Sequence, residues 1–403
     1  MNPTASSTSA TTPFPVDVPA DRVRHVLDRV AAYPWDQAPP GGSWQGGTDP
    51  AFLRRVCERW TGGYDWSRAQ ARINALGSAT ATVDGQTIHF LRVTGTAPDP
   101  LPLLLVPGWP STVLDYADAM EPLADAGHDV VVASMPGYGW SSPPPYPMGP
   151  RPVSALLHRL MTDVLGFDRY AAAGTDFATY VTPWLALDHP DRVAGIHVTA
   201  MNLRPHGAPA GATSWPDTFT AEETAFLRAE GQAQFPLLPY ALVQALQGQT
   251  LSLAMVDNPV GLASWILEKH HAWTPLADGQ DPDAVFDLDR LIDTVMVYAL
   301  TNSFATSILV YAGLFADPGQ LDEGQRVEVP TAFADVADPL VPTPPRSLVE
   351  KAFDVVRWSA PRTGGHFAPF ADPHAWTADV VAFTDTLRAG RGGGVTPGGS
   401  AGS

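Results

Sequence analysis

The sequence predicts an α/β fold with a mostly parallel central sheet, an inserted helical lid and an N-terminal extension. Short apolar runs alternate with helix-like windows over residues 101–201, and the same alternation resumes over 326–390. Between them, residues 202–325 read as mostly helical. Continuous apolar strands that alternate with helices are typical of a parallel sheet covered on both faces. A chain of 403 residues is long enough for one such domain with insertions, or for two domains.

The N-terminal part differs in composition from the rest. Residues 1–12 are rich in Ser, Thr and Ala, which predicts a disordered end. Residues 13–100 are rich in Trp and Pro and form the extension. It is expected to contain two helices and a hairpin of two strands, at 20–32, 49–60, 80–83 and 86–93. The hairpin is indicated by Asp84-Gly85, because this dipeptide favours a type I′ turn.

The remaining elements are predicted from the period of the apolar residues. The core strands are expected at 101–106, 129–134, 170–173, 193–198, 327–334 and 355–359. The core helices are expected at 116–126, 153–165, 348–352 and 376–387. The lid is expected to contain helices at 221–233, 239–247, 261–271 and 288–314. Residues 391–403 are rich in Gly and Ser and form a tail that is predicted to be disordered.

Composition excludes several classes of protein. A formal net charge of -18 argues against a phosphate-binding surface and hence against nucleic acid as a partner. Cys57 is the only cysteine, so an intrachain disulfide and a cysteine-based metal cluster are excluded. Residues 1–12 lack the pattern of a secretory signal, and no apolar run is long enough for a membrane span. A cytoplasmic location is therefore expected.

The most informative segment is Gly174-Thr175-Asp176-Phe177-Ala178, between an apolar run and a helix-like run. A strand, a tight turn and a helix with a reactive residue at the turn form the nucleophile elbow of α/β-hydrolases. The central residue here is Asp176 and not serine, and no Gly-x-Ser-x-Gly occurs. A carboxylate can attack a saturated carbon and leave an ester that water then opens. Taken alone, an aspartate after a strand is more often a helix N-cap.

Two later loops supply partners for this nucleophile. Asp338 follows the strand at 327–334, and His366 follows the strand at 355–359. Nucleophile, acid and histidine is the order of an α/β-hydrolase triad. Asp338 is preferred as the acid, with Asp335 as the alternative. The amides of Trp109, in the Pro107–Pro110 loop, and of Phe177 are expected to form the oxyanion hole.

Together these residues resemble the microsomal-type epoxide hydrolases, the branch of the α/β-hydrolase superfamily with an N-terminal extension. The resemblance covers roughly residues 13–390, and its most specific stretch is Asp257-Asn258-Pro259-Val260-Gly261-Leu262-Ala263-Ser264-Trp265-Ile266-Leu267-Glu268-Lys269. Shorter matches are Tyr64-Asp65-Trp66, Gly108-Trp109-Pro110, Pro136-Gly137-Tyr138-Gly139 and Gly364-Gly365-His366-Phe367-Ala368.

The resemblance implies an enzyme that converts a small-molecule epoxide to a vicinal diol without a metal or organic cofactor. It also implies that Tyr240 and Tyr311, in the lid, hold the epoxide oxygen. The covalent intermediate would be an ester of Asp176. The family includes bacterial members that open epoxides in natural-product assembly. Because only two of the 24 basic residues are lysines, a GC-rich bacterial origin and that role are expectations for this chain.

Departures from the family pattern leave two other functions open. Pro107 and Ala178 replace the usual residues of the oxyanion loop and the elbow, which is compatible with a non-catalytic binding protein on the same fold. A haloalkane dehalogenase also uses an aspartate elbow, but Phe177 has no side-chain N–H for a halide. The apolar lid predicts a bulky apolar or aromatic substrate. A homodimer is an oligomeric state that the sequence leaves open.

Overall fold

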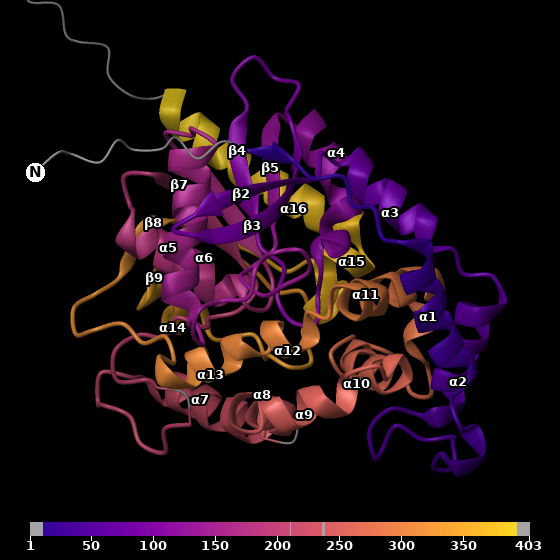
Figure 1. The fold of residues 1–403 in the computed structure, drawn as a ribbon. Coiled ribbons are helices and arrows are strands. Elements are labelled where there is room, and N and C mark those ends of the chain that lie inside the picture. Colours follow the sequence, from indigo (N-terminus) through magenta and orange to yellow (C-terminus); the bar gives the residue numbers. More distant parts are fainter. Residues whose placement is uncertain (1–10, 210, 236–237, 393–403) are drawn as a thin grey trace, which may run out of the picture.

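The computed structural model describes residues 11–209, 211–235 and 238–392. They form a sheet of nine strands in the order β1-β2-β3-β5-β4-β6-β7-β8-β9 (Figure 1). Strands β4 to β9 are parallel, and β1 to β3 add an antiparallel edge. The strands are β1 Thr12–Pro13, β2 Ala79–Val83, β3 Gln86–Val93, β4 Leu101–Leu105, β5 His128–Ala133, β6 Tyr170–Gly174, β7 Val193–Val198, β8 Val327–Ala334 and β9 Phe353–Ser359. The predicted mostly parallel α/β fold is confirmed.

Helices cover both faces of the sheet, which explains why its central strands are apolar throughout. Every residue of β5, β6 and β7 is buried. Helices α5 and α6 pack together on one face, and α4 and α16 pack together on the other (Figure 1). These core helices, with the short α14 and α15, are α4 Ala117–Asp125, α5 Pro150–Arg159, α6 Ala178–Asp188, α14 Arg346–Glu350, α15 Ala368–Ala371 and α16 Pro373–Gly392.

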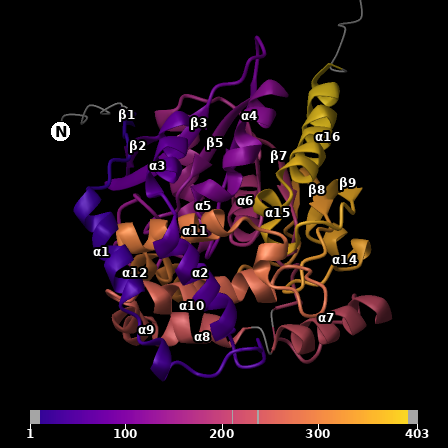
Figure 2. The ribbon, with the colours of Figure 1, turned by 90° about the vertical axis from the view of Figure 1, so that its right-hand side faces the viewer.

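The lid lies between β7 and β8 in the chain and forms a helical layer beyond one end of the sheet, as Figures 1 and 2 both show. Its helices are α7 Ala221–Gln234, α8 Pro239–Leu246, α9 Gly248–Met255, α10 Pro259–Ala272, α11 Leu288–Thr301, α12 Phe304–Ser307 and α13 Leu309–Ala316. The prediction of one continuous helix over 288–314 is wrong. Asn302 adopts a left-handed conformation (φ 54°), which asparagine tolerates, and the chain turns by 90° there.

None of the helices in the described ranges is by itself long and apolar enough to cross a membrane.

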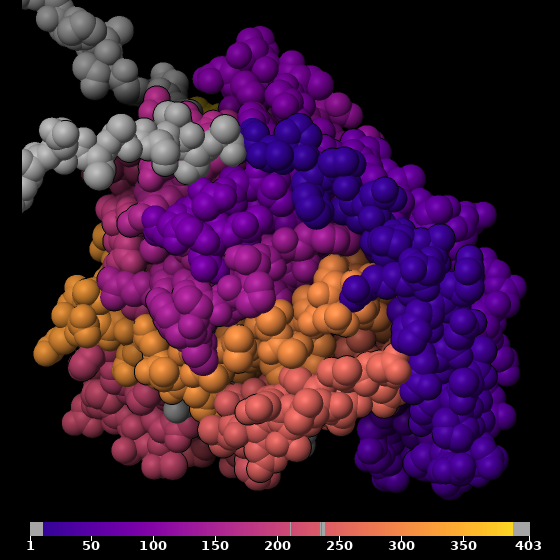
Figure 3. All heavy atoms as spheres, viewed as in Figure 1, coloured from indigo at the N-terminus to yellow at the C-terminus, as the bar shows by residue number. Residues whose placement is uncertain are grey.

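The extension contributes three helices and part of the main sheet. Helices α1 Ala20–Ala31 and α2 Pro50–Gly62 pack against lid helices α10 and α11, and α3 Trp66–Ala75 contacts α11. Figure 3 shows this indigo segment lying along the salmon and orange lid. The hairpin of β2 and β3 turns at Asp84 and Gly85, both with positive φ as a type I′ turn requires. Because β3 pairs with β5, the predicted boundary at residue 100 cuts through the central sheet.

Both predicted disordered ends extend slightly too far. Most of the N-terminal one lies outside the described residues, but Thr12 pairs with Thr80 in the sheet. Most of the C-terminal one also lies outside them, but α16 continues to Gly392. At the N-terminal end, the segment is held by pairing with β2, which its composition does not signal.

Candidate active site

The elbow between β6 and α6 holds Asp176 in a strained backbone conformation. Its φ of 52° lies in the left-handed region that residues other than glycine rarely adopt. Gly174 makes this turn sterically feasible, since a Cβ there would lie 2.5 Å from the Cβ of Ala178. Ala178, an unusual residue for this elbow, is therefore accommodated because position 174 has no side chain. The turn leaves the Asp176 carboxyl group at the carboxyl end of β6.

The loop after β4 packs directly against this carboxylate. A Cβ at Gly108 would overlap the Asp176 side chain, so only glycine fits there. The next residue, Trp109, donates its backbone N–H to Asp176 Oδ1 at 2.7 Å. Within the described chain, the Phe177 N–H makes no hydrogen bond to this carboxylate. Its predicted part in an oxyanion hole therefore stays a prediction.

His366 lies against the second oxygen of the same carboxylate. Its Nε2 is 3.0 Å from Asp176 Oδ2, and its Nδ1 is 2.8 Å from Asp338 Oδ2. Gly364 and Gly365 precede it with φ of 81° and 59°. A Cβ on the first would lie 2.6 Å from the backbone of the next helix, and one on the second 2.5 Å from a proline ring. The two glycines thus let the imidazole approach the carboxyl ends of the strands.

Of the two candidate acids, Asp338 contacts the histidine and Asp335 does not. Asp335 Oδ2 instead forms an ion pair of 2.8 Å with the Arg362 guanidinium, and its Oδ1 accepts from the Ala337 N–H. The Asp338 carboxylate accepts one further bond, from the Leu340 N–H at 2.8 Å. That bond fixes the carboxylate while its other oxygen faces His366.

The two carboxylates control the charge of the buried imidazole. Burial acts to lower the pKa of His366, but the charges of Asp338 and Asp176 and their hydrogen bonds outweigh it and raise that pKa to about 10. With both carboxylates ionised, His366 is therefore an imidazolium at neutral pH. An imidazolium cannot accept a proton, so His366 can act as a base only after one of these negative charges is removed.

The lid contributes two phenols near enough to Asp176 for its charge to affect them. Tyr240 on α8 and Tyr311 on α13 are buried, and their hydroxyl oxygens are 3.3 Å apart. Burial, and also the charge of Asp176, raise the pKa of Tyr240 well above its usual value. Burial, Tyr240 and Asp176 do the same for the pKa of Tyr311. Both phenols therefore keep their protons and can donate hydrogen bonds.

Trp109 contacts both Asp176 and the two lid phenols. The Trp109 backbone N–H binds Asp176, while the Trp109 ring stacks on Tyr240 with centroids 5.6 Å apart and meets Tyr311 edge-on at 6.0 Å. The Phe177 ring also meets Tyr311 edge-on, at 5.1 Å. Direct contacts of this kind set the distance between the phenols and the carboxylate.

Two further residues border the site and were not predicted. The Trp273 ring packs between Tyr240, with ring centroids 5.0 Å apart, and His366, with ring centroids 4.7 Å apart. The Trp273 backbone carbonyl accepts a hydrogen bond from the His366 backbone N–H. The buried Lys269 ammonium lies 4.6 Å from the centroid of the Tyr240 ring, a cation–π contact. Lys269 belongs to the most specific stretch of the resemblance, and that membership was the only available signal.

Comparisons with known sequences identify the domains of this chain. The family described as "Epoxide hydrolase N terminus" matches residues 11–116, and the "alpha/beta hydrolase fold" family matches residues 102–269. Juvenile hormone epoxide hydrolase from Bombyx mori is 29% identical, with 92% of this chain and 85% of that protein covered. Epoxide hydrolase 1 from Sus scrofa is 25% identical, with 96% and 91% covered.

Solved structures give the same result. An enantioselective mutant of an epoxide hydrolase from Aspergillus niger superposes with a TM-score of 0.78 at 25% identity, covering 95% of this chain and 98% of that one. The juvenile hormone epoxide hydrolase of Bombyx mori shares the fold, with a TM-score of 0.78 at 24% identity over 94% and 95% of the two chains. The chain therefore belongs to the α/β-hydrolase superfamily and, within it, to the epoxide hydrolases that carry the N-terminal epoxide hydrolase domain.

Proposed function

We propose that this epoxide hydrolase acts through a covalent ester on Asp176. The observation that carries the proposal is the hydrogen-bonded series from the Trp109 N–H through Asp176 and His366 to Asp338. The amide holds Oδ1, so Oδ1 becomes the ester carbonyl oxygen. The other oxygen, Oδ2, attacks one ring carbon and breaks its bond to the epoxide oxygen.

The phenols act at the oxygen that leaves the carbon. Ring opening places negative charge on that oxygen, and the Tyr240 and Tyr311 hydroxyls stabilise it by donating hydrogen bonds. A proton must then reach the new alkoxide. The His366 imidazolium holds one, and its transfer, through the phenols or a water molecule, leaves a hydroxyalkyl ester and a neutral imidazole.

Formation of the ester switches the role of His366. The ester has no negative charge and is a poorer hydrogen-bond acceptor, so one of the two causes that raise the imidazole pKa disappears. The neutral imidazole, held by Asp338, then takes a proton from water, and the hydroxide attacks the ester carbonyl. Collapse of the tetrahedral intermediate releases the diol and restores the Asp176 carboxylate and the imidazolium. The proton count closes over the cycle.

We also propose that the substrate is an apolar or aromatic epoxide. The groups around the reacting carboxylate are large rings, namely Trp109, Trp273, Phe177 and the two phenols. Such rings favour apolar surface and supply few hydrogen bonds besides the two phenolic ones.

A single turnover in ¹⁸O-water tests the covalent route. With enzyme in excess over styrene oxide, the first diol should contain only ¹⁶O, and one ¹⁸O should be found in the peptide that contains Asp176. This follows because the hydroxyl formed at the attacked carbon comes from the carboxylate and water replaces the carboxylate oxygen. Label in the first diol would show that water attacks the epoxide directly.

A further inference from the structure

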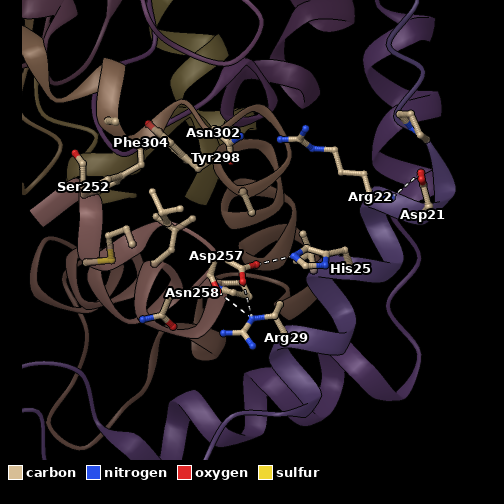
Figure 4. Close-up of a pocket in the computed structure, with 18 residues that line it drawn as sticks. Asp21, Arg22, His25, Arg29, Ser252, Asp257, Asn258, Tyr298, Asn302 and Phe304 are labelled. Carbon is tan, nitrogen blue, oxygen red and sulfur yellow. Dashed lines mark hydrogen bonds and ion pairs between the residues drawn. The ribbon is translucent and has the colours of Figure 1, made fainter. Parts of the chain in front are cut away.

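A partly open cavity of about 830 Å³ lies between the lid and the extension, and the proposed chemistry does not use it. Figure 4 shows it between α1 on one side and the ends of α9, α10 and α11 on the other. A cavity of this size can hold a drug-sized molecule. The cavity lies where the extension meets the lid, a boundary that Figure 3 shows between the indigo and the salmon and orange atoms.

Exposed and buried residues both line the cavity. Val256, 68% exposed, and His25, with 62% of its side chain exposed, lie at its mouth. Tyr298 and Phe304, 2% and 4% exposed, form a buried part of its wall, although Asn302 and Ala305 on either side of Phe304 are exposed. The cavity is therefore a partly open hollow whose wall includes two buried aromatic rings.

The wall formed by Tyr298 and Phe304 contacts the residues next to the reacting carboxylate. The Phe304 ring meets the Trp109 ring edge-on at 6.4 Å, and the Trp109 N–H binds Asp176. Tyr298, which lines the same cavity, donates its hydroxyl to the carbonyl of Ser111, the residue directly after the Pro107–Pro110 loop, at 3.2 Å. Both Tyr298 and Phe304 thus contact the segment that holds Asp176.

The backbone around Phe304 allows local movement more readily than that around Tyr298. Tyr298 lies inside α11, a helix of 14 residues, whereas Phe304 begins α12, a helix of four residues just after the left-handed Asn302. The far side of α12 is tied to the core, since the Thr306 hydroxyl donates to the Gly137 carbonyl at 2.6 Å. The Phe304 side chain can therefore change its rotamer while the rest of α12 stays in place, which would expose the Trp109 ring to the cavity.

We infer that this cavity is the entrance through which the epoxide reaches Asp176, and that Phe304 is the gate that sets the size of the admitted substrate. The inference rests on the proposed function, because it concerns access to that site. Outside the gate, Met255, Val256 and Leu262 supply apolar walls for an apolar epoxide. At the mouth, Asp257 holds α1 to the lid through His25 Nε2 at 2.6 Å and Arg29 Nε at 3.1 Å (Figure 4).

A thiol placed at the mouth tests the route. The natural Cys57 is buried, and its burial raises its pKa to about 12, so it reacts poorly with maleimides. In Val256→Cys, labelling with pyrene maleimide should lower kcat/KM for cis-stilbene oxide by about tenfold or more relative to the unlabelled variant, because association is blocked. The matched control is Leu253→Cys, on α9 three residues before Val256 and 71% exposed but not lining the cavity; its labelling should change kcat/KM less than about twofold.

Size selection at the gate gives the second measurement. Phe304→Leu should raise, and Phe304→Trp should lower, the ratio of kcat/KM for cis-stilbene oxide to that for propylene oxide. A ratio is insensitive to a loss of folded protein. Equal inhibition by label at positions 253 and 256, or a ratio that stays constant in both gate variants, overturns the inference. Absence of diol from every unlabelled protein, the unmodified chain included, instead overturns the proposed function.

Discussion

The core half and the lid half of the site are held in place by different forces. In the core half, backbone geometry and hydrogen bonds fix each reactive group. Asp176 has a positive φ, and His366 follows two glycines of positive φ. In the lid half, Tyr240 and Tyr311 lie on ordinary helices, and ring packing against Trp109 sets their position.

The reacting groups of the core half must be held in exact positions, whereas the phenols of the lid half can bind the epoxide oxygen after small shifts in position. A strained elbow permits one orientation of a carboxylate, whereas stacked rings tolerate small shifts at little energetic cost. We therefore expect changes in the core half to remove single chemical steps, and changes in the lid half to weaken all steps that develop charge on the epoxide oxygen.

The largest effect is expected from loss of the nucleophile. Asp176→Ala should lower kcat by about 10⁴-fold or more, because no other carboxylate in the site can form the ester. Diol formation from styrene oxide measures this. Asp176→Asn is the companion variant, since asparagine tolerates the left-handed backbone; it should fold normally and be equally inactive. Normal turnover by either variant would refute the role of Asp176.

Loss of the base should stop the cycle after its first step. In His366→Gln, ester hydrolysis should slow by about 10²–10⁴-fold because general-base assistance is lost. Ring opening should also slow, since the imidazolium supplies its proton, but the ester should still accumulate. Intact-protein mass spectrometry should detect an increase equal to the mass of the substrate. An inactive variant without this adduct would place His366 in the first step alone.

The sequence predicted the core half more completely than the lid half, for a physical reason. Glycines beside Asp176 and His366 are local signals, because positive φ and close packing require them. In the structure, Asp335 and Asp338 differ because the Arg362 guanidinium binds Asp335 and leaves Asp338 to His366. Arg362 is distant from Asp335 in the sequence. That contact could not be predicted from spacing.

The lid residues had no local signal at all. A tyrosine on a helix is usually a core residue, so Tyr240 and Tyr311 were found only through the family resemblance. Trp273 and Lys269 were missed as site residues for the same reason, because their roles arise from tertiary contacts with Tyr240. The break at Asn302 was missed because the apolar period continues across it.

The two phenols should share one task. Tyr240→Phe or Tyr311→Phe alone should cost about 2–3 kcal/mol in kcat/KM, since one donor to the developing charge remains. The double variant should lose more than either and retain the ¹⁸O pattern of the covalent route. KM should change little if the phenols act mainly on the transition state. If one single variant is as inactive as the double, the other phenol has no catalytic part.

The last prediction concerns stability and follows from the raised pKa of His366. Because the folded-state pKa is about 10 and the ordinary value is 6.5, its ion pairs stabilise the fold fully below pH 6.5. That stabilisation is lost as the pH rises through about 10. The free energy of unfolding should thus fall by about 4 kcal/mol between pH 6.5 and 10, beyond any change shared by all variants.

Matched amide variants assign this slope to one carboxylate. Asp338→Asn removes a charge that raises the His366 pKa, so it should flatten the fall in unfolding free energy measured by urea denaturation across this pH range. Asp335→Asn removes an equal charge that pairs with Arg362 instead, so the slope should persist. Equal slopes in both variants would mean that the charge on His366 does not depend on Asp338, and the core half would then lack the coupling on which its base chemistry relies.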